Sequence, residues 1–112
     1  MNLLLDTHVA IWAVVGDPRL GAAAIQRLCA NPGGLWVSAA SIWEIAIKHS
    51  LGRGANSMPF SGAEAIGHFR DAGFRLLDIR PEHTAAVETL PHLHSDPFDR
   101  LLIAQEIGRA HV

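Results

Sequence analysis

Cysteine is nearly missing from the chain, because Cys29 is the only one among 112 residues. A single cysteine excludes a disulfide framework within the chain, and with it the class of small disulfide-rich secreted domains. Cys29 falls in an Ala- and Leu-rich stretch, where we expect a small buried hydrophobic residue. The cysteine content therefore fits the reducing environment of the cytoplasm.

Long apolar runs are missing as well. The longest one, Val9–Val15, is far shorter than the roughly 18 residues that a membrane-spanning helix needs. The N-terminus has no basic lead and reaches Asp6 directly after Leu5, which is unlike a secretory signal. We therefore expect a soluble cytoplasmic protein whose mature chain starts at Met1.

There is no excess of positive charge. Nine basic and eleven acidic side chains give a formal net charge of -2, which argues against a general nucleic-acid coat protein. The balance changes if Asp6, Glu44, Asp96 and Asp99 form one site, because nine basic and seven acidic groups then remain outside it. With this local balance of +2, a polyanion could approach the rest of the surface.

The apolar residues that are present suffice for one domain with one core, at 49% of the sequence. Short apolar runs predict strands at Leu3–Leu5, Leu35–Val37 and Phe74–Ile79. The helices predicted between and after them are His8–Val15, Leu20–Ala30, Ser41–Ser50, Ser61–Gly73, Pro81–Leu90 and Asp96–Gln105. This alternation favours an α/β fold in which helices flank a parallel sheet, with ligand sites beyond the carboxyl ends of the strands.

Three of the predicted helices start with capping signals. Ser41–Glu44 has the Ser-x-x-Glu form of a capping box, and Ser61–Glu64 repeats it. Asp96 is followed by a proline, which suits an N-cap residue and the first helical position. We predict that these helices begin at these residues.

Three acidic residues fall where such a sheet exposes its ligand crevice. Asp6 ends the first strand, and Glu44 and Asp99 each lie in the first turn of a helix. Mg²⁺ and Mn²⁺ prefer a few carboxylate oxygens and keep several waters, which suits phosphodiester chemistry. Each acid also has a structural explanation, as a helix cap, as the capping partner of Ser41, or as a charge favoured by the helix dipole. Spacing alone leaves both interpretations open.

Three segments of the chain carry a family resemblance. They are LLDTH at Leu4–His8, VSAASIWEIAIK at Val37–Lys48 and LPHLHSDPFDRLLIAQ at Leu90–Gln105. In this order and spacing they resemble PIN-domain ribonuclease toxins of the VapC family, which belong to type II toxin-antitoxin systems. The resemblance implies a PIN-like, Rossmann-like α/β fold, a metal-dependent endoribonuclease, and a cognate antitoxin protein that silences it.

The resemblance also implies the site residues. Asp6, Glu44 and Asp99 match the acidic cluster of the family, which would be catalytic and would hold Mg²⁺ or Mn²⁺. Asp96, one helical turn from Asp99, would be an accessory ligand of the metal. Two hydroxyl positions, Thr7 and Ser38, would hold waters or orient carboxylates, and hydrogen bonds at strand ends are the structural alternative.

The expected mechanism is metal-assisted hydrolysis of RNA. The carboxylates would hold one or two ions that acidify a water and stabilise the charge on the phosphate, so no protein nucleophile is required. The candidates for binding RNA phosphates are Lys48, Arg100 and Arg53. Solvated surface charge is the alternative for these three.

Other interpretations remain open. A catalytically silent PIN-like module would bind RNA or a protein without cleaving, and a phosphatase with a strand-end nucleophile would need a second acid where His8 stands. A zinc site at His92, His94 and Asp96 lacks the support of a cysteine pair. Helix Ile42–Ile47 is apolar around most of its circumference, and a homodimer or antitoxin contact would cover the excess.

The C-terminus departs from the family pattern. Proteins of this type continue with more helix, a closing strand and a further polar group near the site. The last six residues, Ile107–Val112, match the translation of a common sequencing-adapter sequence. We therefore expect a PIN domain over residues 1–106, a non-native tail over 107–112, and no C-terminal strand.

Overall fold

The computed structural model describes residues 2–52, 57–90, 96–105 and 110–111. Its strands form one sheet in the order β3-β2-β1-β4, and all three pairings are parallel. The strands are β1 (Leu3–Leu4), β2 (Leu35–Ser38), β3 (Arg75–Leu77) and β4 (Ala110–His111). The prediction of a parallel sheet with flanking helices is confirmed.

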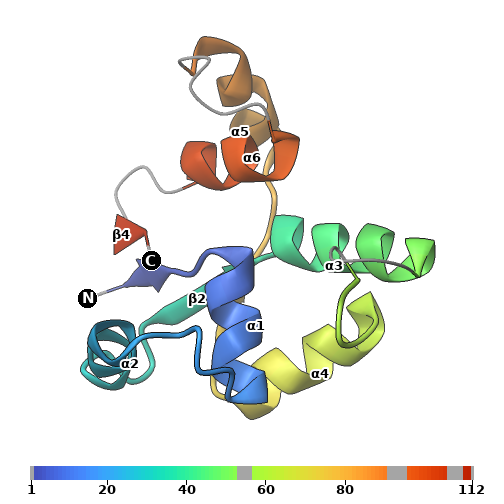
Figure 1. Cartoon of the computed structure of the whole chain (residues 1–112). Helices are drawn as coiled ribbons and strands as arrows, with labels where there is room; N and C mark the ends of the chain where they lie inside the picture. The colour runs from blue at the N-terminus through green and yellow to red at the C-terminus, as the bar shows by residue number, and fades with distance from the viewer. Residues whose placement is uncertain (1, 53–56, 91–95, 106–109, 112) are drawn as a thin grey trace.

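Helices cover both faces of this sheet. They are α1 (Thr7–Val15), α2 (Ala22–Cys29), α3 (Ala39–Leu51), α4 (Gly62–Asp71), α5 (Pro81–Ala86), the 3₁₀ turn η2 (Val87–Thr89) and α6 (Pro97–Gln105). Figure 1 shows α5 and α6 on one side of the sheet, α1, α2 and α4 on the other, and α3 extending from the end of β2. In the part of the chain that the structure describes, no helix is long and apolar enough to cross a membrane.

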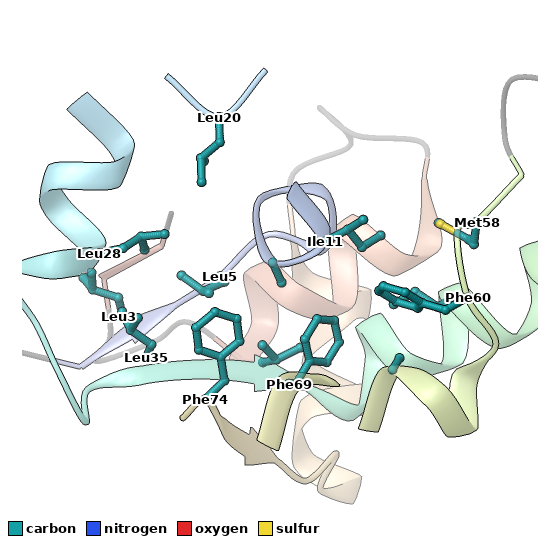
Figure 2. Packing of buried hydrophobic residues seen from close by; sticks show 14 residues of the cluster. Leu3, Leu5, Ile11, Leu20, Leu28, Leu35, Met58, Phe60, Phe69 and Phe74 are labelled. Atoms are coloured by element: carbon teal, nitrogen blue, oxygen red, sulfur yellow. The ribbon is translucent and has the colours of Figure 1, made fainter. Parts of the chain in front are cut away.

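The core has two parts because the first strand faces both ways. Leu3 and Leu5 lie in a large cluster with residues of α1, α2 and α4, such as Phe69, and with Phe74, which precedes β3 (Figure 2). Leu4 points to the other face, in a smaller cluster with residues of α6. Burying each leucine contributes about 1.5 to 3 kcal/mol, so a strand buried on both faces reads as a continuous apolar run. Outside the core, the thiol side chain of Cys29 is exposed, so the expectation of a buried cysteine is wrong.

The expectation of a missing C-terminal strand is also wrong. Ala110 and His111 pair in parallel with Leu3 and Leu4 and cover the free edge of β1. The unpaired backbone groups at a sheet edge can bind a further strand whatever its side chains are. The amino-acid composition of this segment therefore did not predict a strand. The prediction that residues 107–112 are a non-native tail is separate from this pairing and stays a prediction.

The start of α3 differs from the sequence expectation, whereas two other caps agree with it. Ser38, not Ser41, is the N-cap, and its Oγ accepts a hydrogen bond from the N–H of Ala40 at 2.9 Å. The capping box of Ser61–Glu64 is present with both of its hydrogen bonds. Asp96 caps α6, because its Oδ1 accepts the N–H of Phe98 at 2.8 Å. Glu44 is therefore not a capping residue.

Helix α4 approaches the α3 helix closely at Gly62. A Cβ at this position would lie 2.9 Å from Ala46 Cβ, whereas a Cβ at Gly67 in the same helix would meet nothing within 4 Å. We expect Gly62→Ala to lower the free energy of unfolding by about 1 to 3 kcal/mol, because the two helices must separate. Gly67→Ala should raise it by about 0.5 to 1 kcal/mol through the loss of backbone entropy in the unfolded chain. Urea denaturation followed by circular dichroism measures both.

A compensating substitution controls for other effects of Gly62→Ala. Ala46→Gly removes the opposing Cβ, so the double variant should recover part of the lost stability. Equal stabilisation by Gly62→Ala and Gly67→Ala would contradict the close helix contact.

Candidate active site

Asp6 lies at the carboxyl end of β1, where the chain enters α1. It is the N-cap of α1, and its Oδ2 accepts a hydrogen bond from the N–H of His8 at 3.3 Å. Asp6 is only partly buried, and a carboxylate has more acceptor positions than this one bond uses. The structural explanation as a cap is thus correct for Asp6, and it leaves room for a ligand.

A hydrogen bond between two buried hydroxyls joins α1 to α3. Thr7 Oγ1 lies 2.8 Å from Ser41 Oγ, and both side chains are buried. Thr7 follows Asp6 in the chain, and Ser41 lies about one helical turn before Glu44. This bond therefore fixes the strand end that carries Asp6 beside the helix that carries Glu44.

Glu44 is a buried carboxylate with one engaged and one unengaged oxygen. Its side chain is 4% exposed, and Oε2 accepts a hydrogen bond from Lys48 Nζ at 2.6 Å. Its Oε1 is buried and has no hydrogen-bond partner among the described residues. A buried, unpaired carboxylate oxygen is unfavourable unless a cation or water meets it, which makes Glu44 the strongest metal-ligand candidate of the site.

The ammonium of Lys48 lies in a region of negative charge. The hydrogen bond to Glu44 raises the pKa of the Lys48 ammonium above its usual value, burial opposes this, and the charges of Glu44, Asp96 and Asp99 add to the rise. The charges of Glu44 and of the two acids at the start of α6 thus act on the same ammonium. That the predicted acids share one metal site stays a prediction.

Ser38 and Gln105 connect α6 to the sheet. Ser38 Oγ donates a short hydrogen bond to Gln105 Oε1, and both side chains are buried. Gln105 Nε2 donates to the carbonyl oxygen of Asp78 at 3.2 Å and lies 3.4 Å from His83 Nδ1. Both hydroxyls that the resemblance pointed to, Thr7 and Ser38, thus bond to protein groups, and their accessory role toward a metal stays a prediction.

The donor set fits a hard cation in its chemistry. In residues 2–52, 57–90, 96–105 and 110–111, no group of three or more acidic, histidine or cysteine side chains is arranged to hold a metal ion. Mg²⁺ is commonly held by only one or two carboxylates and keeps several waters, so an open acidic edge suits it better than it suits Zn²⁺. The unpaired Oε1 of Glu44 is the observation that favours a cation here.

The two candidate phosphate ligands that the structure describes already have hydrogen-bond partners. The ammonium of Lys48 contacts Glu44, and a guanidinium nitrogen of Arg100 donates to the carbonyl oxygen of Val87 at 2.7 Å. Arg53 lies outside the described residues, as do His92 and His94. The phosphate-binding role of the three basic residues stays a prediction.

The fold is that of a known protein family. A model of the PIN domain matches residues 3–107, so the chain belongs to the PIN-domain family. Among solved structures, it is similar to the Mycobacterium tuberculosis toxin VapC20, which cleaves the sarcin-ricin loop. The TM-score is 0.56 at 14% sequence identity, over 96% of this chain and 82% of that one, so the likeness is one of fold. No curated protein matches the chain.

Two residues of the site were missed or misread in the sequence. Ser41 is not a helix cap but the partner of Thr7, inside the first turn of α3. Gln105 was not singled out, although a polar residue directly after the apolar run Leu101–Ala104 is a signal that a buried amide could leave. Both act between elements that are distant in the chain, which local patterns do not record.

Proposed function

We propose that the chain is a metal-dependent endoribonuclease and the toxin of a type II toxin-antitoxin system, acting in the cytoplasm. Membership of the PIN-domain family and the VapC-like fold support this proposal. The observation that carries the metal dependence is the buried Oε1 of Glu44, which has no hydrogen-bond partner among the described residues. Asp96 and Asp99 add negative charge around the same lysine.

In the proposed mechanism, the bound cation and the residues of the chain have separate roles. Bound Mg²⁺ or Mn²⁺ would supply an acidified water and would stabilise charge on the phosphate. Asp6, Glu44 and Asp99 would hold the ion, with Asp96 as accessory ligand. Thr7 and Ser38 would keep these acids in place through their bonds to Ser41 and Gln105. The phosphate of the RNA would be met by Lys48, Arg100 or Arg53.

Removal of the metal tests this proposal. We expect the purified chain to cleave a mixed RNA pool with Mn²⁺ or Mg²⁺ and to lose this activity in EDTA, because the acids alone cannot activate water. Gel electrophoresis of the RNA measures it, and added Mn²⁺ should restore cleavage. Asp6→Asn and Asp99→Asn should be inactive under all conditions. Cleavage that persists in EDTA would contradict the metal dependence, and no cleavage by a folded chain would favour a silent module.

A protein partner is part of the proposal. Three large apolar side chains on α3 are exposed at one-turn spacing, namely Trp43 at 50%, Ile47 at 38% and Leu51 at 67%. They lie on the helix that carries Glu44, so a cognate antitoxin or a second copy of the chain that covers them would also approach the site. Light scattering of the isolated chain separates the two, because a monomeric mass at high concentration contradicts the homodimer.

A further inference from the structure

A groove runs beside the acidic site, between the exposed side of α1 and the end of α3. Its volume is about 350 Å³, within the range of small-ligand pockets. The side chains that matter here are His8, Trp12, Asp17, Arg19, Lys48 and Met58. None of the residues proposed as metal ligands lines it.

Two hydrogen bonds nevertheless link the groove to the site. His8 lines it, and the backbone N–H of His8 donates to the carboxylate of Asp6, while Lys48 lines it and donates to the carboxylate of Glu44. Two of its lining residues thus touch two of the proposed ligands. The groove therefore lies next to the proposed metal ligands Asp6 and Glu44.

The interior of the groove offers planar groups. The rings of His8 and Trp12 have centroids 6.0 Å apart, and Arg19 Cζ lies 5.1 Å from the centroid of the Trp12 ring. Trp12 is partly buried, so its ring is held in place by the core while one part remains accessible. Aromatic rings and guanidinium planes are the surfaces on which proteins stack unpaired bases.

The charges that line the groove are already matched. Arg19 forms an ion pair with Asp17 at 2.7 Å, and a hydrogen bond from the guanidinium holds the pKa of the Asp17 carboxyl below its usual value. Lys48 is paired with Glu44. Since both cations have an anionic partner, the lining of the groove is close to neutral and suits a planar group without charge.

We propose that this groove binds an unpaired nucleobase of the RNA substrate, beside the phosphate that is cleaved. The proposal rests on the ribonuclease function and adds a site that selects single-stranded RNA and contributes to the choice of sequence. The exposed outer plane of the Arg19 guanidinium, which Asp17 holds over the Trp12 ring, forms the stacking surface.

Binding in EDTA tests the groove without cleavage. Fluorescence anisotropy compares a five-nucleotide RNA with an abasic ribose-phosphate strand of equal length, and we expect the RNA to bind about tenfold more tightly. Arg19→Lys keeps the charge but loses the planar guanidinium, so most of this tenfold preference should disappear while binding of the abasic strand stays the same. Arg19 is exposed, so the fold should not depend on it.

Arg75 provides the matched control. Its Cζ lies 5.4 Å from the ring of Trp36, outside the groove, so Arg75→Lys should leave the preference unchanged. In NMR spectra, the RNA should also shift the indole N–H signal of Trp12 and not that of Trp36. Equal binding of RNA and abasic strand, or equal effects of the two lysine substitutions, would overturn the proposal.

Failure of the groove proposal can be distinguished from failure of the ribonuclease proposal. Metal-dependent cleavage without any base preference would overturn the groove alone. A base preference that vanishes in Arg19→Lys, in a chain that cleaves no RNA, would support the groove and reject the nuclease.

Discussion

Glu44→Gln should lower the rate of RNA cleavage by about 100-fold or more, while the protein stays folded. The substitution keeps the size of the side chain but removes the negative charge that would hold the metal ion. It also leaves the ammonium of Lys48 without its closest carboxylate, although Asp96 and Asp99 remain near it. We therefore expect a loss of stability of about 1 to 3 kcal/mol, which a stability of about 5 to 15 kcal/mol can absorb. Single-turnover cleavage with saturating Mn²⁺ measures the rate.

Glu64→Gln is the matched control, because the chain has two Ser-x-x-Glu segments with different roles. Glu64 accepts the N–H of Ser61 in a true capping box, which glutamine can also do, so cleavage should not change. Thermal melts of both variants show whether a loss of activity is a loss of fold. If Glu44→Gln cleaves RNA as fast as Glu64→Gln does, Glu44 is not a metal ligand.

This pair of segments also shows what the sequence could and could not predict. Ser41–Glu44 and Ser61–Glu64 have the same local pattern, and only the second forms a capping box. The difference arises because Ser38 ends β2 and caps α3 before the chain reaches Ser41, whose hydroxyl then meets Thr7. The competing cap is visible in the sequence, but the long-range partner of Ser41 is not.

The fold was predictable because its main signals are local. Leu3–Leu5 is buried on both faces, as a continuous apolar run at the centre of a parallel sheet requires. The proline after Asp96 marks the start of α6 correctly. The strand Ala110–His111 was not predictable, since its pairing uses backbone groups and the vacant edge of β1 rather than a side-chain pattern.

The connections of the candidate site could not be predicted from the sequence. Family resemblance selected the acids, whose role as metal ligands stays a prediction, and the charges of Glu44, Asp96 and Asp99 all act on Lys48. The sequence does not show that Lys48 already pairs with Glu44, or that Arg100 reaches the carbonyl of Val87, because both depend on how helices pack. Interactions of this kind decide which charges are available to a substrate.

Gln105→Met tests the hydrogen bonds by which Gln105 connects α6 to Ser38 and Asp78. The change removes the amide that accepts from Ser38 and donates to Asp78, at nearly constant side-chain length. We expect the free energy of unfolding to fall by about 1 to 3 kcal/mol, because buried polar groups lose their partners. Cleavage should fall by about tenfold or more at a temperature where the variant is folded. The reason is that α6 carries Asp96 and Asp99, and a displacement of about 1 Å is costly in an active site.

A double-mutant cycle with Ser38→Ala separates positioning from general destabilisation. If Gln105 acts through Ser38, the double variant should cleave about as well as the worse of the two single variants, because both remove the same bond. Gln26→Met, on the exposed side of α2, controls for the chemistry of the substitution and should change neither stability nor cleavage. Additive losses of activity in the cycle would mean that the two residues act independently, and the hydrogen bond between β2 and α6 would then not be what positions the acids of α6.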